Sequence, residues 1–145
     1  MSGPSRRALL GALAGLAAAP ALGQGARGRV VVVGGGFGGA SAARALHRAG
    51  LAVTLVEAET TYTACPFSNE VIAGLRDLKQ QEFGYDAIAR DGVVVVPMAA
   101  TAVDPSAKTV ALGDGTKLSY DRLVIAPGID PDWKALPGYD EKAAE

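Results

Sequence analysis

Four short apolar runs are spaced along the chain, and each has the length of a strand rather than that of a helix. They occupy Arg29–Val33, Ala52–Val56, Val93–Val96 and Arg122–Ala126. Apolar residues follow one another in these runs almost without interruption, which indicates strands that are covered on both faces. We therefore predict an α/β fold around a parallel sheet, with the strands in the order third, second, first and fourth.

Turn residues divide the connection between the third and fourth runs into three short strands. These strands are expected at Thr101–Val103, Thr109–Leu112 and Lys117–Ser119. The turns between them are Asp-Pro-Ser at 104–106 and Gly-Asp-Gly at 113–115. The pattern predicts a small antiparallel β-meander in the place where a crossover helix would otherwise lie.

The connection between the second and third runs, from Thr60 to Arg90, is far longer than a usual loop. Within it we predict a helix over Asn69–Leu78, with Ser68 as its N-cap, and a second short helix over Tyr85–Arg90. Such a long excursion is often functional.

A glycine cluster follows the first run and fits the pattern G-x-G-x-x-G at Gly34, Gly36 and Gly39. In a Rossmann-like fold these glycines permit a tight turn, a close approach to a pyrophosphate and close packing of helix on sheet, respectively. Glu57 ends the second run at the distance where an acid binds the ribose hydroxyls, and it disfavours NADP, whose 2′-phosphate would meet a like charge. The predicted dinucleotide site comprises Gly34, Gly36, Phe37, Gly38, Gly39 and Glu57.

Composition excludes several other classes of site. The chain has 145 residues and a formal net charge of -1, which allows one domain and provides no basic field for a nucleic acid. One cysteine, Cys65, excludes an internal disulfide and a Cys-rich zinc site, and the single histidine, His47, excludes a His-based metal cluster.

The N-terminus has the layout of an export signal. Arg6 and Arg7 precede an Ala-, Leu- and Gly-rich stretch that is too short and too rich in glycine for a stable membrane span. We expect a signal peptide over residues 1–24 and the N-terminal part of a dinucleotide-binding domain from residue 25 to residue 145. Paired arginines favour the twin-arginine route to the periplasm, with an ordinary secretory signal as the alternative.

Residues 120–128, YDRLVIAPG, resemble the flavoproteins with two dinucleotide-binding domains, in which an aspartate precedes an apolar strand that ends in A-T-G beside FAD. Pro127 stands here in place of the threonine. The resemblance implies FAD at the glycine loop, with Ala126 and Gly128 close to it. The backbone near Ala100, just after the third run, is expected to touch the adenine.

A narrower resemblance rests on CPFSNEVIAG at 65–74, FGYD at 83–86 and GYDE at 138–141. These segments look like the flavoprotein subunit of flavocytochrome c sulfide dehydrogenase. That family oxidises sulfide with a redox-active cysteine pair and passes the electrons to a c-type cytochrome subunit. The resemblance implies that Cys65 carries FAD through an 8α-thioether.

The chain corresponds to only the N-terminal, FAD-binding portion of that family, and the fold is expected to be truncated accordingly. Because Cys65 is the only cysteine, neither member of the redox pair is present and we assign no catalytic residue. Three alternatives remain: a sulfide:quinone or NADH:quinone oxidoreductase, a non-catalytic dinucleotide-binding module, and, for Cys65 itself, a buried structural thiol.

Overall fold

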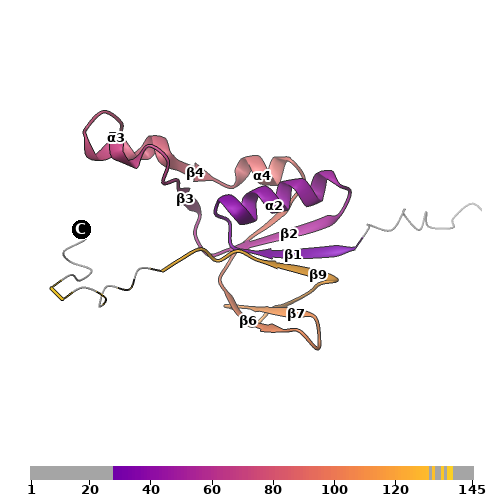
Figure 1. The fold of residues 1–145 in the computed structure, drawn as a ribbon. Coiled ribbons are helices and arrows are strands. Elements are labelled where there is room, and N and C mark those ends of the chain that lie inside the picture. The colour runs from indigo at the N-terminus through magenta and orange to yellow at the C-terminus, as the bar shows by residue number, and fades with distance from the viewer. Residues whose placement is uncertain (1–27, 131, 133–134, 136, 139–145) are drawn as a thin grey trace, which may run out of the picture.

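A four-stranded parallel sheet forms the centre of the computed structural model, which describes residues 28–130, 132, 135 and 137–138 (Figure 1). The sheet order is β5-β2-β1-β9, as predicted. The strand bounds are β1 Arg29–Val33, β2 Ala52–Glu57, β5 Val94–Pro97 and β9 Arg122–Ile125. The expected signal peptide lies outside the described residues.

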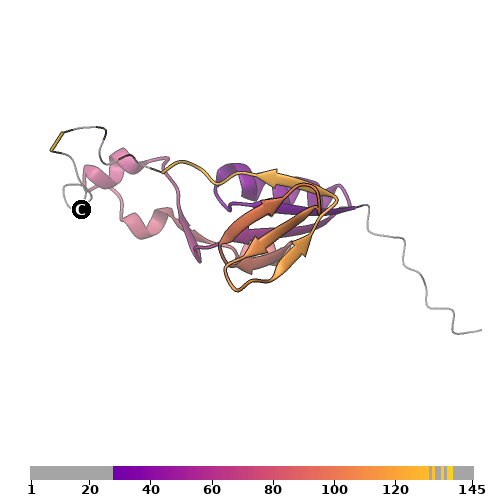
Figure 2. The ribbon, with the colours of Figure 1, turned by 90° about the horizontal axis from the view of Figure 1, so that it is seen from below.

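Different layers cover the two faces of this sheet (Figures 1 and 2). Helix α2 (Phe37–Arg48) and the short helix α4 (Asp86–Arg90) lie on one face. The other face carries the three-stranded antiparallel sheet β6-β7-β8, which confirms the predicted meander. Its bounds are β6 Ala100–Asp104, β7 Thr109–Leu112 and β8 Lys117–Ser119.

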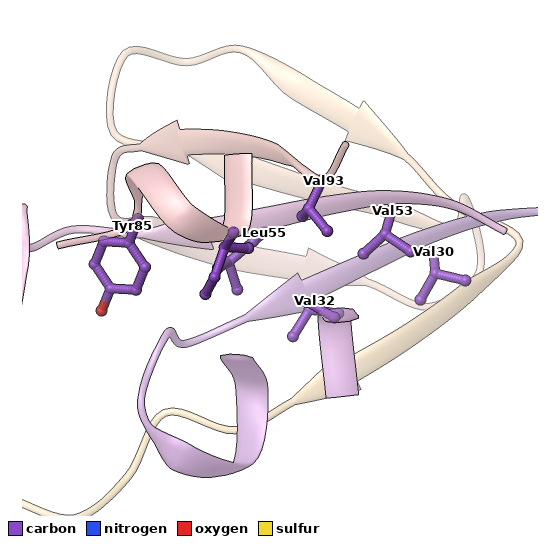
Figure 3. Packing of buried hydrophobic residues seen from close by; sticks show 8 residues of the cluster. Val30, Val32, Val53, Leu55, Tyr85 and Val93 are labelled. Atoms are coloured by element: carbon purple, nitrogen blue, oxygen red, sulfur yellow. The ribbon is translucent and has the colours of Figure 1, made fainter. Parts of the chain in front are cut away.

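The valines of β1 are buried on both sides because successive side chains of a strand point to opposite faces. Val30 and Val32 pack with Leu55 in the cluster beneath the helices (Figure 3), whereas Val31 packs with Val110 beneath the meander. Val32, Leu55 and Val110 are each 0% exposed. Burial of each such side chain stabilises the fold by about 1.5–3 kcal/mol, which explains why the apolar runs are continuous.

The long segment after β2 forms an arm that extends away from the sheet (Figures 1 and 2). Its base is a two-stranded antiparallel pair, β3 (Thr61–Thr63) with β4 (Glu82–Gly84), in which Tyr62 lies opposite Phe83. The sequence analysis did not predict this pair, because two strands of three residues leave no readable periodicity.

The helix predicted over Asn69–Leu78 is wrong in length and in its cap. Helix α3 covers only Ser68–Ile72, and a short 3-10 helix, η1, follows at Leu78–Gln81. Gly74, with φ of +73°, stands just past the end of α3, where glycine commonly stops a helix. Phe67 rather than Ser68 occupies the N-cap position, and no side chain caps the helix there.

Candidate dinucleotide-binding site

The glycine loop begins at Gly34, where the backbone passes between two neighbouring strands. The Gly34 N–H donates to the carbonyl of Val56 on β2 at 2.9 Å, and its φ is +96°. A Cβ atom at this position would lie 2.1 Å from the carbonyl oxygen of Ala126, which follows β9. Only glycine fits between these carbonyls, so the predicted role of Gly34 in a tight turn has a direct physical cause.

Helix α2 starts immediately after this turn and lies very close to it. A Cβ atom on Gly39 would lie 1.7 Å from the carbonyl oxygen of Gly34, so the helix can approach only where the side chain is absent. The first turn of α2 contains no acidic residue. Its free N–H groups and the positive end of its dipole are therefore available to an anion.

Two tyrosine rings cover the middle of the loop. A Cβ atom on Gly35 would lie 2.6 Å from the hydroxyl oxygen of Tyr85, and one on Gly36 would lie 3.3 Å from the ring of Tyr62. Tyr62 also packs edge-on against Phe37, with the ring centroids 5.5 Å apart. Gly35 occupies a variable position of the motif, so the motif alone gave no indication that the Tyr85 ring lies against this residue.

Glu57 connects the end of β2 to the glycine loop. Its carboxylate accepts the N–H of Gly35 at 2.5 Å and the N–H of Glu59 at 3.0 Å. The side chain thus fixes the loop as well as presenting a negative charge at the predicted ribose position. Both of its oxygens have spare lone pairs with which to accept ribose hydroxyls.

These elements line one groove of about 840 Å³ at the carboxyl end of the sheet. A dinucleotide is expected at this edge in an open α/β sheet. Of the predicted site residues, the groove brings together Gly36, Phe37, Gly38, Glu57, Cys65, Ala126 and Gly128. Gly34 and Gly39 do not line the groove, but they permit the tight turn and the close packing of α2 that shape it. The prediction missed several lining residues: Glu59, Thr61, Tyr62, Thr63, Tyr85, Pro127 and Ile129.

Ala100 does not belong to this lining. It lies on β6, where it pairs with Leu112 and packs against the cluster beneath the meander. Its proposed contact with an adenine stays a prediction.

The groove offers N–H groups rather than cationic side chains. The charged residues that line it are Glu57 and Glu59, so a pyrophosphate would be held by the glycine loop and the start of α2. Burial, together with the nearby carboxylate of Glu57, raises the pKa of the Tyr85 phenol to about 12. Tyr85 therefore remains protonated, and a hydrogen-bond donor, at any physiological pH.

Cys65 is exposed and lines the groove, so it is not the buried structural thiol that the sequence left open. It follows β3 in the arm, and its carbonyl accepts the N–H of Ser68 at 3.0 Å.

Within the described residues, no group of three or more His, Cys, Asp and Glu side chains could hold a metal ion.

Comparison with known proteins places this groove in a family context. Residues 28–145 match the family model of pyridine nucleotide-disulphide oxidoreductases. The chain belongs to this family. Its members are flavoprotein oxidoreductases with a Rossmann-like fold, so the predicted fold class is confirmed and FAD or a similar flavin is the expected cofactor.

Three similar proteins illustrate the range of the pyridine nucleotide-disulphide oxidoreductases. A probable ferredoxin reductase of Castellaniella defragrans is 35% identical over 116 residues, 76% of this chain and 28% of the relative. The flavoprotein chain of sulfide dehydrogenase (flavocytochrome c) of Chlorobaculum thiosulfatiphilum is 60% identical over 45 residues, which are 30% of this chain and 94% of that sequence. The sulfide:quinone oxidoreductase structure from Aquifex aeolicus has a TM-score of 0.62 and 30% identity, over 70% of this chain and 24% of that one.

The flavocytochrome c match confirms the resemblance that the sequence motifs indicated. The chain spans little more than a quarter of the length of the ferredoxin reductase relative.

Among the described residues, no helix has the length and apolar character needed to cross a membrane.

Two adjacent glycines provide a matched test of the loop. Gly39→Ala should destabilise the fold by about 1–3 kcal/mol, because the new methyl group overlaps the Gly34 carbonyl and α2 must shift. Gly38→Ala meets nothing closer than 3.9 Å and should stabilise the helix by about 0.5–1 kcal/mol. Thermal and urea unfolding measure both effects. Equal stabilities of the two variants would contradict the close approach.

Proposed function

We propose that this chain binds FAD as part of a periplasmic flavoprotein that oxidises sulfide and passes the electrons to a c-type cytochrome subunit. The proposal rests above all on Cys65, which lies in the dinucleotide groove within the CPFSNEVIAG segment. The 60% identity to a flavocytochrome c flavoprotein chain supports the same assignment.

The residues of the groove fit FAD. The glycine loop leaves room for a pyrophosphate where side chains would obstruct it, and Glu57 supplies acceptors for ribose hydroxyls. The chemistry that FAD supplies when bound is the acceptance of an electron pair and its release in single steps, as a haem acceptor requires. The chain itself positions the nucleotide through backbone N–H groups, and we assign none of its residues to the sulfide chemistry.

Cys65 is proposed to form the covalent link to the flavin. The β3-β4 pair anchors the arm beside the glycine loop, and the cysteine that follows β3 remains exposed to the groove. An accessible thiol can react, whereas a buried one is inert. Cys65 is the only cysteine in this chain.

The covalent link can be tested on a denaturing gel. Flavin fluorescence should migrate with the wild-type polypeptide, and Cys65→Ser should abolish the fluorescent band. The variant is expected to keep FAD under native conditions, because the glycine loop and Glu57 are unchanged, and this serves as the control for folding. Flavin that separates from wild-type protein on denaturation would contradict the link.

A related quinone reductase is the second candidate, since the sulfide:quinone oxidoreductase structure is similar to this chain at 30% identity. The two candidates differ in the electron acceptor. A non-catalytic dinucleotide-binding module is the third, and it would carry no redox-active flavin.

Co-purification distinguishes these functions. The natively produced protein, captured from periplasmic extract, should bring with it a subunit that stains for haem and shows a c-type absorption spectrum. Sulfide added without oxygen should then reduce that haem. Reduction of a membrane quinone as the sole acceptor would favour the quinone reductase, and a colourless protein would favour the binding module.

Export by the twin-arginine route is proposed because this route carries folded proteins, and FAD is acquired in the cytoplasm. Arg6→Lys together with Arg7→Lys keeps the charge and should trap the precursor in the cytoplasm. Cell fractionation with immunoblotting measures the outcome. Normal periplasmic delivery of the double variant would exclude the twin-arginine route and leave an ordinary secretory signal.

A further inference from the structure

Tyr85 stands between the apolar core and the groove, and the sequence motif assigns it no role. Its ring packs into the cluster that contains Leu55, Ile88 and Val93, and the residue is only 9% exposed. Figure 3 shows its hydroxyl at the end of the ring that points away from the core valines. The ring is therefore held by packing, while the polar atom is directed out of the core.

The hydroxyl lies beside the glycine loop. A Cβ atom on Gly35 would lie 2.6 Å from this oxygen, and the N–H of the same glycine donates to Glu57. Tyr85 and Glu57 thus flank one residue of the loop, and both line the groove. The negative charge of Glu57 also acts on the Tyr85 phenol, which places the two groups in one electrostatic environment.

The two side chains have complementary hydrogen-bonding capacity. An ionised carboxylate only accepts, whereas a phenol that remains protonated also donates. Burial raises the pKa of Tyr85 to about 12, so the donor persists across the working range of pH. A ribose hydroxyl is both a donor and an acceptor, and it can satisfy one group of each kind.

We propose that the Tyr85 hydroxyl donates a hydrogen bond to a ribose hydroxyl of the bound dinucleotide, next to the ribose contact of Glu57. Tyr85 is then a second ribose-binding residue, and its fixed ring sets the position of that donor before the ligand arrives. This inference rests on the proposed function, because it requires the adenosine half of a dinucleotide in this groove.

The test uses the full chain carrying Cys65→Ser and freed of flavin, so that the groove can exchange nucleotides. ADP, 2′-deoxy-ADP and 3′-deoxy-ADP are titrated calorimetrically into this protein and into its Tyr85→Phe derivative. Tyr85→Phe should weaken ADP binding by about 3- to 10-fold, the effect expected of one hydrogen bond. For one of the two deoxy analogues, Tyr85→Phe should cause no loss of affinity, because the hydroxyl that accepts the bond from Tyr85 is already absent.

The control is Tyr120→Phe, which removes the hydroxyl of a buried tyrosine on the meander side of the sheet and should leave ADP affinity unchanged. Equal ADP affinity of the proteins with and without Tyr85→Phe would overturn the inference, and so would additive losses for both deoxy analogues. If Tyr85→Phe unfolds, the three nucleotides are compared on the protein that retains Tyr85. Equal binding of ADP and both deoxy analogues to that protein overturns the contact. A protein with Tyr85 that binds no adenine nucleotide would contradict the proposed function as well.

Discussion

The close approach of three backbone segments at Gly34 is the constraint on which the rest of the site depends. At this residue the chain leaves β1, passes the carbonyls of Val56 and Ala126, and turns into α2 beneath Gly39. A methyl group at Gly34 or at Gly39 would overlap a carbonyl oxygen. The start of α2 can point into the groove only because both side chains are absent.

The groove obtains its polarity from backbone more than from side chains. Its charged side chains, Glu57 and Glu59, are acidic, so the attraction for a pyrophosphate must come from oriented N–H groups and the helix dipole. Glu57 has a second role, because the carboxylate that is predicted to bind the ribose also accepts the N–H of Gly35. A change at Glu57 would therefore disturb the loop together with the predicted ribose contact.

The arm turns a long connection into part of the site. Antiparallel pairing of β3 with β4 returns the chain to its starting point, so the segment between them can extend away while its base stays beside the glycine loop. Tyr62 at this base packs on Phe37, and Cys65 just beyond it enters the groove lining. The arm thereby brings an exposed thiol to the groove, which the parallel sheet alone would not supply.

The sequence by itself determined the sheet order, the meander, the glycine loop and the position of Glu57 at the end of β2, because each leaves a local pattern of apolar runs, turn residues or spacing. Only the tertiary structure decided that Tyr85 and Tyr62 cover the loop and that the Tyr85 ring occupies the space of a side chain at Gly35. The contact between Tyr85 and Gly35 joins positions far apart in the chain, and the β3-β4 pair is held by three residues on each side. Such contacts depend on how separate segments pack against one another, and no periodicity within either segment encodes them.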